Sequence, residues 1–255
     1  MWFAITREIS SAFQNCQLTH LARVAIDLER ARAQHDAYEW ALVELGCTVR
    51  RVDTAAEMPD SVFVEDAAVV FREGAVIARP GAESRRAETP AVAEALARFG
   101  LSHRDIQEPG TLDGGDVLVV GRNVFVGASR RTNAAGINQL RQIITRLGYS
   151  VRAVPVQDCL HLKSAVTVVA PKTLLINRNW VEADAFGDLR LIDVDDDEPH
   201  AANALLVGDV VICAAAFPKT RARLEQHGLR VKVVDVDEIA KAEGGVTCCS
   251  LIFEW

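Results

Sequence analysis

The sequence lacks any hydrophobic run that could span a membrane. Its longest apolar run, at 210–217, is far shorter than the ~18 residues that a membrane helix needs. The opening residues, MWFAITREIS, become polar too soon for a secretory signal, so we expect a cytoplasmic protein with no membrane partner. A basic stripe is also missing, because the arginines are scattered and the net charge is −7, which argues against nucleic acid as a partner.

The cysteines are not arranged for metal binding. The chain has 6 cysteines but no Cys-x-x-Cys pair, and no second Cys or His cluster could complete a zinc site. A cytosolic protein keeps its thiols reduced, and adjacent cysteines rarely bridge each other. We therefore predict no disulfide, no metal and no cofactor. The neighbouring residues Cys248 and Cys249 are then either buried filler or include a nucleophile.

The composition favours a folded, globular protein. With 255 residues, the chain is long enough for one large domain or two small ones. Hydrophobic residues make up 49% and charged residues 25%, which provides a sizeable core and argues against disorder. A repeat that runs along the chain favours a single domain over residues 1–255.

A pattern of helix, glycine and strand recurs five times along the chain. Each helix-like stretch ends at a glycine placed like the residue that closes a helix with a positive φ. The five glycines are Gly46, Gly100, Gly148, Gly187 and Gly228. Apolar stripes at helical spacing precede the first three of them. These stripes are Tyr38, Ala41, Leu42 and Leu45; Val92, Leu96 and Phe99; and Ile137, Leu140, Ile144 and Leu147. The fourth and fifth helices are expected to be short.

Two apolar runs around a tight turn precede most of these helices. The runs lie at 66–80, 116–129, 165–179 and 202–216, and their turns are typical of hairpins. The first unit has only one leading strand, at 2–6, and its partner can be the run TCCSLIF near the C-terminus. That pairing would close the units into a ring, which protects sheet edges as in propellers. We predict an α/β fold, a five-bladed pseudo-symmetric ββαβ propeller; an ordinary α/β sandwich with accidental glycines is the alternative.

Polar residues gather just before the leading strand of each unit. These segments read PDSVFVED, LDGGD, LHLKS, AAN and EGGVTC. In a five-bladed ring all of them face one axis, where residues far apart in the sequence can form one site. The candidates are Asp60, Glu65, Asp66, Asp113, Asp116, His161, Lys163, Asn203 and either Cys248 or Cys249.

Cys248 is the better candidate for a nucleophile. Neighbouring side chains of a strand point to opposite faces, so Cys249 would share an apolar face with Leu251 and Phe253. A thiol is mostly protonated at neutral pH and needs a base or a cation nearby. His161 is the one histidine at an axial position. The alternatives are a buried, inert cysteine and a structural, hydrogen-bonded histidine.

Several acids near a cysteine indicate a cationic substrate. Asp66 and Asp113 could clamp a planar guanidinium through paired, charged hydrogen bonds. Arg85 and Arg131 could hold a carboxylate at the other end of the same ligand. The alternatives are aspartates that form turns or caps, and arginines that are ordinary surface charge.

Six ordered motifs, from about residue 18 to the C-terminus, carry a resemblance to a known family. They are PDSVFVED, RPGAESRR, LDGGDVL, GASRRTNAAG, LHLKS and TCCS. Together they resemble the dimethylarginine dimethylaminohydrolases of the pentein, or guanidine-modifying, superfamily, whose fold is a five-bladed ββαβ ring. The resemblance implies an enzyme that hydrolyses asymmetric dimethylarginine and monomethylarginine to citrulline. Dimethylamine or methylamine would be released, and a covalent amidino-thioether on cysteine would be the intermediate.

The same resemblance implies roles for individual residues. The nucleophile falls on Cys248, the general acid and base on His161, and the third catalytic acid on Asp113, where some members of the family have Glu. The substrate-binding residues that it implies are Leu18, Asp60, Glu65, Asp66, Arg85, Arg131 and Ala242. No metal is implied for catalysis, although zinc can occupy such a site as an inhibitor.

Other functions stay open at this point. An arginine deiminase-like hydrolase of another guanidino substrate would use the same fold and the same catalytic residues. Transfer of an amidino group to an amine and non-catalytic binding of methylated arginine are further alternatives. Intact Cys248, His161 and Asp113 argue against a mere binder. The sequence leaves open the preference among guanidino amino acids and the oligomeric state, a homodimer included.

Overall fold

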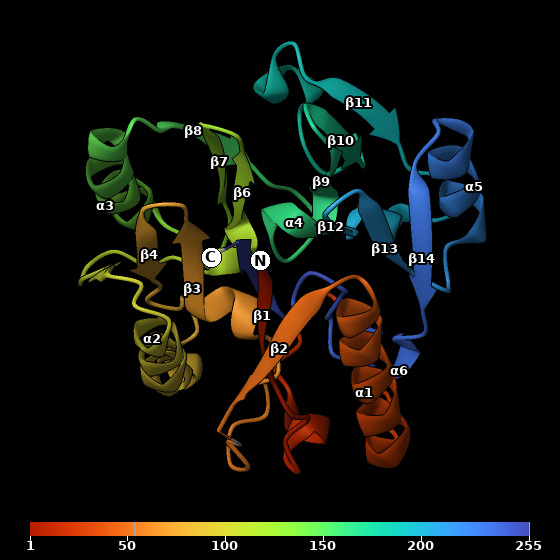
Figure 1. Cartoon of the computed structure of the whole chain (residues 1–255), viewed down its shortest axis with the longest axis horizontal. Coiled ribbons are helices and arrows are strands. Elements are labelled where there is room, and N and C mark those ends of the chain that lie inside the picture. Colours follow the sequence, from red (N-terminus) through yellow and green to blue (C-terminus); the bar gives the residue numbers. More distant parts are fainter. Residues whose placement is uncertain (54, 255) are drawn as a thin grey trace.

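The computed structural model describes residues 1–53 and 55–254, and its strands form five three-stranded sheets around an axis (Figure 1). In spatial order the sheets are β15 (Leu251–Glu254), β1 (Trp2–Arg7) and β2 (Cys47–Val52); β3 (Ala68–Phe71), β4 (Gly74–Ile77) and β5 (His103–Asp105); β6 (Val117–Val120), β7 (Asn123–Ala128) and β8 (Ser150–Pro155); β9 (Val166–Ala170), β10 (Thr173–Ile176) and β11 (Arg190–Asp193); and β12 (Leu205–Val207), β13 (Val210–Ala214) and β14 (Arg230–Val234). In every sheet the middle strand pairs antiparallel with the first and parallel with the third. The predicted five-bladed fold is therefore confirmed.

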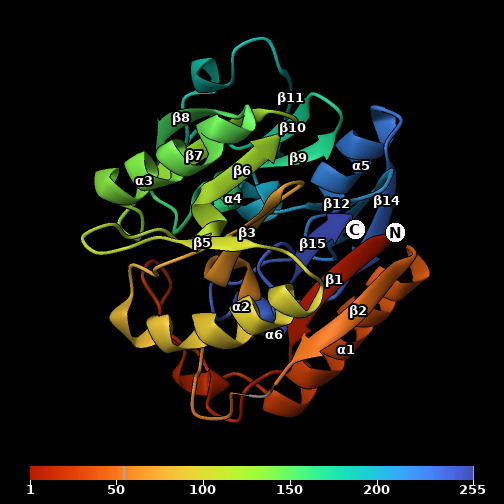
Figure 2. The same cartoon turned by 60° about the vertical axis from the view of Figure 1, so that its left-hand side comes forward.

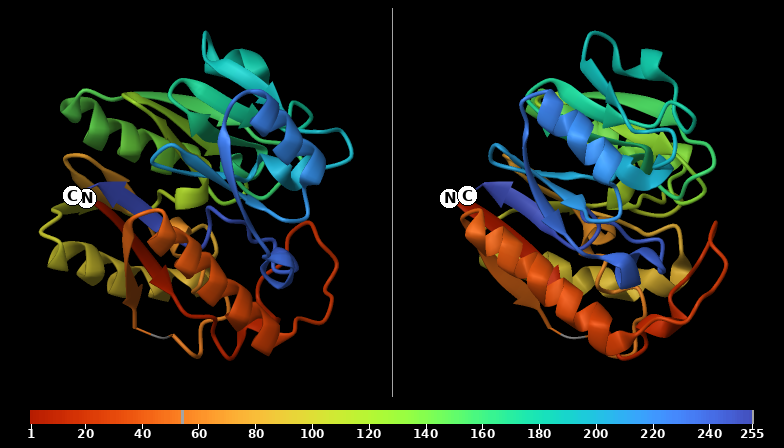
Figure 3. Two further views of the ribbon diagram at one scale, coloured as in Figure 1. Left: turned by 45° about the vertical axis from the view of Figure 1, so that its right-hand side comes forward. Right: turned by 90° about the vertical axis from the view of Figure 1, so that its right-hand side faces the viewer.

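The ring closes where the two ends of the chain meet. β1 pairs antiparallel with β15, with Phe3 opposite Phe253, and the two termini lie side by side in Figures 2 and 3. This is the predicted closure, but the last strand is shorter than expected and begins at Leu251. Cys248 and Cys249 lie in the turn before it. Alternation along a strand therefore does not decide which of the two cysteines faces the axis.

Helices cover the outside of the ring. α1 (Leu28–Glu44), α2 (Thr89–Arg98), α3 (Ala134–Ile144) and α5 (Pro218–Gln226) each connect the second and third strands of a unit and lie at the periphery (Figure 1). The fourth helix, which was expected to be short, is a 3-10 turn, η6 (Ala183–Phe186). α4 (Leu162–Ala165) precedes β9, and α6 (Asp237–Ala240) follows β14. All five repeat glycines have positive φ, as predicted.

The core consists of five apolar clusters between the sheets and their helices. The predicted stripes lie in the first three clusters, where Leu42, Leu96 and Leu140 are fully buried. Leu147 is an exception with 40% exposure, because α3 ends at Ile144 before the stripe is complete. In the fourth cluster Phe186 of η6 takes the place of a helix. Every unit thus shares a core with its neighbours.

The first strands of the units line the axis. β15 contacts β3, and β9 contacts both β6 and β12. The turns that precede these strands consequently end at the centre of the ring, where the polar segments of the sequence lie. Within the described residues, no helix combines the length and the apolar character needed to cross a membrane.

Ring closure can be tested at Phe253. Its ring stacks on Phe3 at 5.9 Å and meets Phe99 edge-on at 5.3 Å, so it ties β15 to β1 and to the end of α2. We expect Phe253→Ala to lower the free energy of unfolding by about 3–5 kcal/mol, because it leaves a cavity at the closure. Phe253→Leu, which keeps more of the volume, should cost clearly less. Urea denaturation checks both, and an unchanged midpoint in Phe253→Ala would show that closure adds little.

Candidate active site

The polar turns before the five inner strands are hydrogen-bonded to one another around the axis. One bond of 2.9–3.2 Å joins each turn to the next. These bonds run from Glu65 N–H to the Cys248 carbonyl, from Gly115 N–H to Asp66, from Leu162 N–H to Asp116, from the Asn203 amide to the Lys163 carbonyl, and from Thr247 N–H to Asn203. Residues separated by more than a hundred positions are thereby brought together, as the repeat predicts.

His161 lies at the start of α4 between two carboxylates. Its Nε2 is 3.0 Å from Asp113 Oδ2, and its Nδ1 is 3.7 Å from Asp66 Oδ1. The residue is only 4% exposed. Burial opposes its charge, but the charge of Asp66 and the hydrogen bond to Asp113 outweigh burial and raise the pKa of His161 to about 9. The imidazole therefore carries a proton at neutral pH and can act as an acid.

Asp66, in the 3-10 turn η2 (Val64–Ala67), stays ionised although it is buried. Its Oδ2 accepts a hydrogen bond from Arg85 Nη1 at 2.5 Å, and its Oδ1 accepts the Gly115 N–H at 3.0 Å. Burial opposes the charge of Asp66, but His161 and Arg85 outweigh it and hold the pKa of this carboxyl well below its usual range. Asp66 thus provides a permanent negative charge beside His161.

Asp113 is fully buried at the start of the 3-10 turn η4 (Gly114–Asp116). Its Oδ1 accepts the Gly81 N–H at 2.8 Å, while its Oδ2 faces His161. A second buried acid of this turn, Asp116, accepts the Leu162 N–H at 2.9 Å and the Ser129 hydroxyl at 2.6 Å. Burial raises the pKa of Asp116 to about 6. Asp113 thus holds the ring of His161, and Asp116 holds the backbone that follows it.

Cys248 presents a protonated thiol to the axis. Its Sγ accepts the Gly245 N–H at 3.3 Å and is half-buried, whereas Cys249 is almost completely buried. Burial raises the pKa of the Cys248 thiol to about 12, and the negative charges of Glu65 and Asp66 add to the effect. A cation placed against the sulfur would favour the thiolate again. Cys249 is thus the more buried of the two, as predicted, although both lie in a turn, and the role of Cys248 as nucleophile stays a prediction.

Glu65 forms a buried ion pair close to the thiol. Its Oε1 is 2.6 Å from Lys163 Nζ, and its Oε2 accepts the Thr247 hydroxyl at 2.8 Å. Burial raises the pKa of Glu65, while Lys163 acts in the opposite direction. The carboxylate is thus already engaged, and Glu65 braces η2 against the cysteine turn.

The two arginines expected to hold a carboxylate are placed differently. Arg85 is buried and binds Glu88, Asp66 and two backbone carbonyls, so its guanidinium is fully engaged. Arg131 Nη1 is buried and has no hydrogen-bond partner among the described residues, and it lies 3.9 Å from Asp113 Oδ2. Of the two, Arg131 has the free donor that a carboxylate would require.

Three further residues that the resemblance implies for substrate binding, Leu18, Asp60 and Ala242, lie on neighbouring segments. The Asp60 carboxylate is buried and accepts the Gln17 N–H at 3.1 and 3.3 Å, next to the half-buried Leu18. Burial raises the pKa of Asp60. Ala242 is 3% exposed and follows α6. Leu18 and Ala242 belong to one apolar cluster, the former as a partly buried member, so the two segments meet.

Sequence reasoning assigned no role to Gly115 and Thr247. A Cβ on Gly115 would lie 2.7 Å from both Asp66 Oδ1 and His161 Nδ1, so only glycine allows these two groups to approach. Thr247 joins Glu65 to Asn203. The glycine pair in LDGGD is a visible signal, because glycine allows other groups to approach the backbone closely. The threonine has no comparable signal, because its partners lie in other units.

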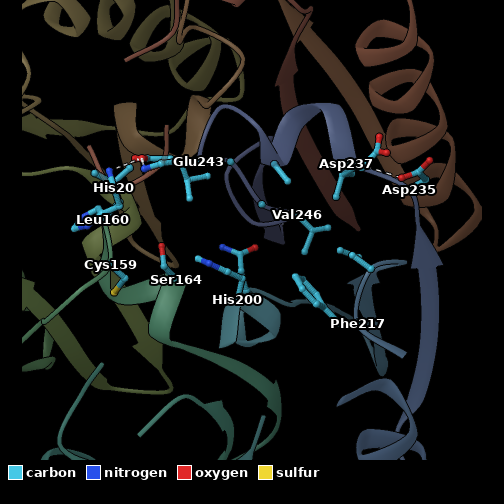
Figure 4. Close-up of a pocket in the computed structure, with 18 of the residues that line it drawn as sticks. His20, Cys159, Leu160, Ser164, His200, Phe217, Asp235, Asp237, Glu243 and Val246 are labelled. Carbon is cyan, nitrogen blue, oxygen red and sulfur yellow. Dashed lines mark hydrogen bonds between the residues drawn. The ribbon is translucent and has the colours of Figure 1, made fainter. Parts of the chain in front are cut away.

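A cavity of about 290 Å³ lies beside these residues and shares walls with the site (Figure 4). Asn203 and Gly245 line it and also contact the Cys248 sulfur. Figure 4 shows His200, Phe217 and Val246 around its middle and Glu243 close to His20 at one side. The cavity therefore adjoins the thiol, but its lining does not include Asp66, Asp113 or His161.

Metal ligands are available at two places among the described residues. Ligand atoms of Asp66, Asp113 and His161 lie within 4.8 Å of one another, as do those of His35, Asp36 and Glu39. In the first group each residue already bonds to protein groups, and His161 carries a proton. The arrangement therefore fits proton transfer as it stands, while a metal would have to displace that proton.

The chain matches the sequence model of the family described as N,N dimethylarginine dimethylhydrolase, eukaryotic, over residues 4–254. It is 46% identical over 248 residues to an N(G),N(G)-dimethylarginine dimethylaminohydrolase of Streptomyces coelicolor, covering 97% of this chain and 95% of that protein. A protein of the same description from Pseudomonas aeruginosa is 38% identical over 229 residues, which are 89% of this chain and 90% of the relative.

Solved structures give the same grouping. A cysteine-to-serine mutant from Pseudomonas aeruginosa, complexed with citrulline, superposes with a TM-score of 0.93 at 35% identity and covers 98% of both chains. An adduct of a histidine-to-glycine dimethylarginine dimethylaminohydrolase with S-methyl-L-thiocitrulline has a TM-score of 0.92 at 36% identity, covering 99% of this chain and 100% of that one. The N-terminal domain of a cyanobacterial arginine dihydrolase, at 19% identity and a TM-score of 0.89, shares the fold.

The charge on His161 can be measured directly. We expect NMR of histidine-labelled protein to show His161 titrating with a pKa of about 9. Asp113→Asn removes the hydrogen-bonded negative charge, so the pKa of His161 should fall by roughly one unit or more. Asp184→Asn, which changes an exposed carboxyl in η6, is the matched control and should leave this titration where it is. A His161 that is neutral near pH 7 in the unsubstituted protein would contradict the electrostatic account.

Proposed function

Because the chain belongs to the dimethylarginine dimethylaminohydrolase family, we propose that it hydrolyses asymmetric dimethylarginine and monomethylarginine to citrulline, with release of dimethylamine or methylamine. One observation carries this proposal: the buried imidazole of His161 lies between the carboxylates of Asp113 and Asp66, and the turn of Asp66 is hydrogen-bonded to the turn of Cys248. A thiol, an acid and carboxylates that attract a cation are the groups needed to break a bond at a guanidinium carbon.

The first step is proposed to depend on the charge of the substrate. The Cys248 thiol is protonated in the empty site, because burial and nearby carboxylates raise its pKa to about 12. A guanidinium held by ionised Asp66 brings a positive charge next to the sulfur and stabilises the thiolate, whose proton leaves to solvent. The thiolate then attacks the central carbon of the guanidinium. The enzyme thus has a reactive nucleophile only when its substrate is present.

His161 is proposed to act twice. As an acid it protonates the methylated nitrogen, the C–N bond breaks, and dimethylamine or methylamine leaves a covalent amidino-thioether on Cys248. The imidazole, now neutral, takes a proton from a water molecule that attacks the same carbon. The C–S bond breaks, and the thiol and citrulline are formed. Asp113, hydrogen-bonded to Nε2, orients the ring and stabilises its charged form in both halves of the reaction.

The amino-acid end of the substrate is proposed to lie toward the segment that contains Leu18. Asp60 and the backbone at Leu18 and Ala242 would surround the α-amino group, and Arg131, which has a free donor at Nη1, would bind the carboxylate. Arg85 is proposed to act mainly by holding Asp66 in place and ionised, because its own donors are already engaged. Its predicted direct contact with the carboxylate stays a prediction. Glu65 is proposed to support the site through Lys163 and Thr247.

Several broader expectations remain proposals. We infer that residues 1–255 act as one catalytic domain, that the enzyme works in the cytoplasm, and that its partner is a small guanidino amino acid. The predicted homodimer is open to test by sedimentation. Hydrolysis of arginine itself, as in a deiminase, is the alternative activity. Values of kcat/KM for arginine and for dimethylarginine, measured side by side, distinguish the two.

The covalent intermediate gives the sharpest test of this function. Mass spectrometry of enzyme quenched during turnover should show an amidino adduct on the C-terminal peptide, and fragmentation should place it on Cys248. Cys248→Ser should abolish both the adduct and citrulline formation. Cys249→Ser, the neighbouring control, should retain them. His161→Ala should slow turnover by ~10²–10⁴, the usual contribution of general acid–base catalysis. Turnover without Cys248, or an adduct on another residue, would overturn the assignment.

A further inference from the structure

The segment 17–21 is held between two carboxylates of the site region. At one end the Gln17 N–H bonds to both oxygens of Asp60. At the other, the backbone N–H groups of Thr19, His20 and Leu21 all donate to Glu243 Oε1, at 2.9, 2.5 and 2.6 Å. Figure 4 shows this contact beside His20, at the side of the cavity. A segment that is otherwise a loop is therefore tied down at both ends.

The Glu243 contact is unusual in its geometry. Successive backbone N–H groups that converge on one point form a concavity that binds anions. Glu243 provides that anion. Its backbone has a φ of 58°, a conformation that is unfavourable in free energy for a residue with a side chain. Its second oxygen, Oε2, is buried and has no hydrogen-bond partner among the described residues. The strained backbone and the unpaired oxygen both cost free energy. The interaction that offsets this cost is the set of three hydrogen bonds to the segment 17–21.

The position of Glu243 connects this contact to the chemistry. It directly follows Ala242 and lies on the same loop as Gly245, whose N–H bonds to the Cys248 sulfur. The tied segment contains Leu18, next to Asp60, and its Thr19 hydroxyl is 3.5 Å from Arg131 Nη2. One carboxylate thus joins the loop of the nucleophile to the segment that faces the proposed amino-acid end of the substrate.

We propose that Glu243 is a positioning residue that latches the segment 17–21 across the site and thereby sets the affinity for substrate. It does so by fixing the backbone at Leu18 and the side chain of Arg131, without touching the reacting atoms. The role in affinity rests on the proposed function, while the latch itself does not. Loss of the latch raises KM and leaves the chemical step largely unchanged.

The latch can be tested without substrate. Hydrogen-exchange mass spectrometry of the unliganded enzyme should show protected amides at Thr19, His20 and Leu21. Glu243→Ala should raise their exchange at least roughly tenfold, the factor that corresponds to the loss of one charge-assisted hydrogen bond. Glu243→Gln keeps an oxygen acceptor in the same place and should retain part of the protection. Unchanged exchange at these amides in Glu243→Ala would overturn the latch.

Kinetics then test whether the latch positions the substrate. In Glu243→Ala we expect KM for dimethylarginine to rise roughly tenfold, with kcat close to that of the unsubstituted enzyme and with partial rescue in Glu243→Gln. Glu238→Gln is the matched control, because this carboxylate also accepts a backbone N–H, that of Asp27, but lies outside the segment; its KM should not change. Increased exchange with an unchanged KM would reduce Glu243 to a structural tether and contradict the positioning role. No turnover by the unsubstituted enzyme would refute the proposed function instead, and the exchange experiment would still decide the latch.

Discussion

The closed circle of hydrogen bonds between the five axial turns is the constraint on which the rest of the structure depends. Each bond joins one unit to the next, and the last joins Glu65 to the cysteine turn at the far end of the chain. No single unit contains more than a part of the site. Closure of the ring by β1 and β15 therefore does more than protect sheet edges, since it brings the turn of Cys248 next to the turn of Glu65 and Asp66.

Charge at the axis is arranged so that the empty site is ready but unreactive. Burial keeps Cys248 in its thiol form, and the charge of Asp66, which helps to keep His161 protonated, adds to that effect, because negative charge favours a cation and disfavours a thiolate. Arg85 and Lys163 neutralise part of the acids while remaining bound to them. In the proposed mechanism, a flat cation bound beside Asp66 brings a positive charge next to the Cys248 sulfur. Binding of the substrate would then also activate the proposed nucleophile.

The sequence predicted most of the fold because the fold is repeated. Helix-closing glycines, hairpin turns and the incomplete first unit each report a local backbone requirement, and all pointed to the same ring. The wrong details have local causes as well. The fourth helix shrinks to η6, and Cys248 lies in a turn where an extended strand was expected. Periodicity over a few residues cannot distinguish a short helix from a 3-10 turn, or a strand from a turn.

The sequence predicted which polar segments meet at the axis, but not how their side chains are bonded. Polar residues before each inner strand identified Asp113, His161 and Cys248, and the structure brings their turns together. The engagement of Arg85 with Asp66, the pairing of Lys163 with Glu65, and the Glu243 contact join residues from different parts of the ring. Nothing in the local sequence reports such pairs, because they depend on how closely the units pack.

The central claim, that the cation of the substrate creates the thiolate, is tested most directly by the ultraviolet absorbance of thiolate, taken as the difference between the enzyme and its Cys248→Ser variant. The account predicts no Cys248 thiolate in the unliganded enzyme from neutral pH up to the limit of its fold, and its appearance at lower pH when an unreactive guanidinium ligand is bound. A thiolate already present near neutral pH without ligand, or no change on binding, would contradict it.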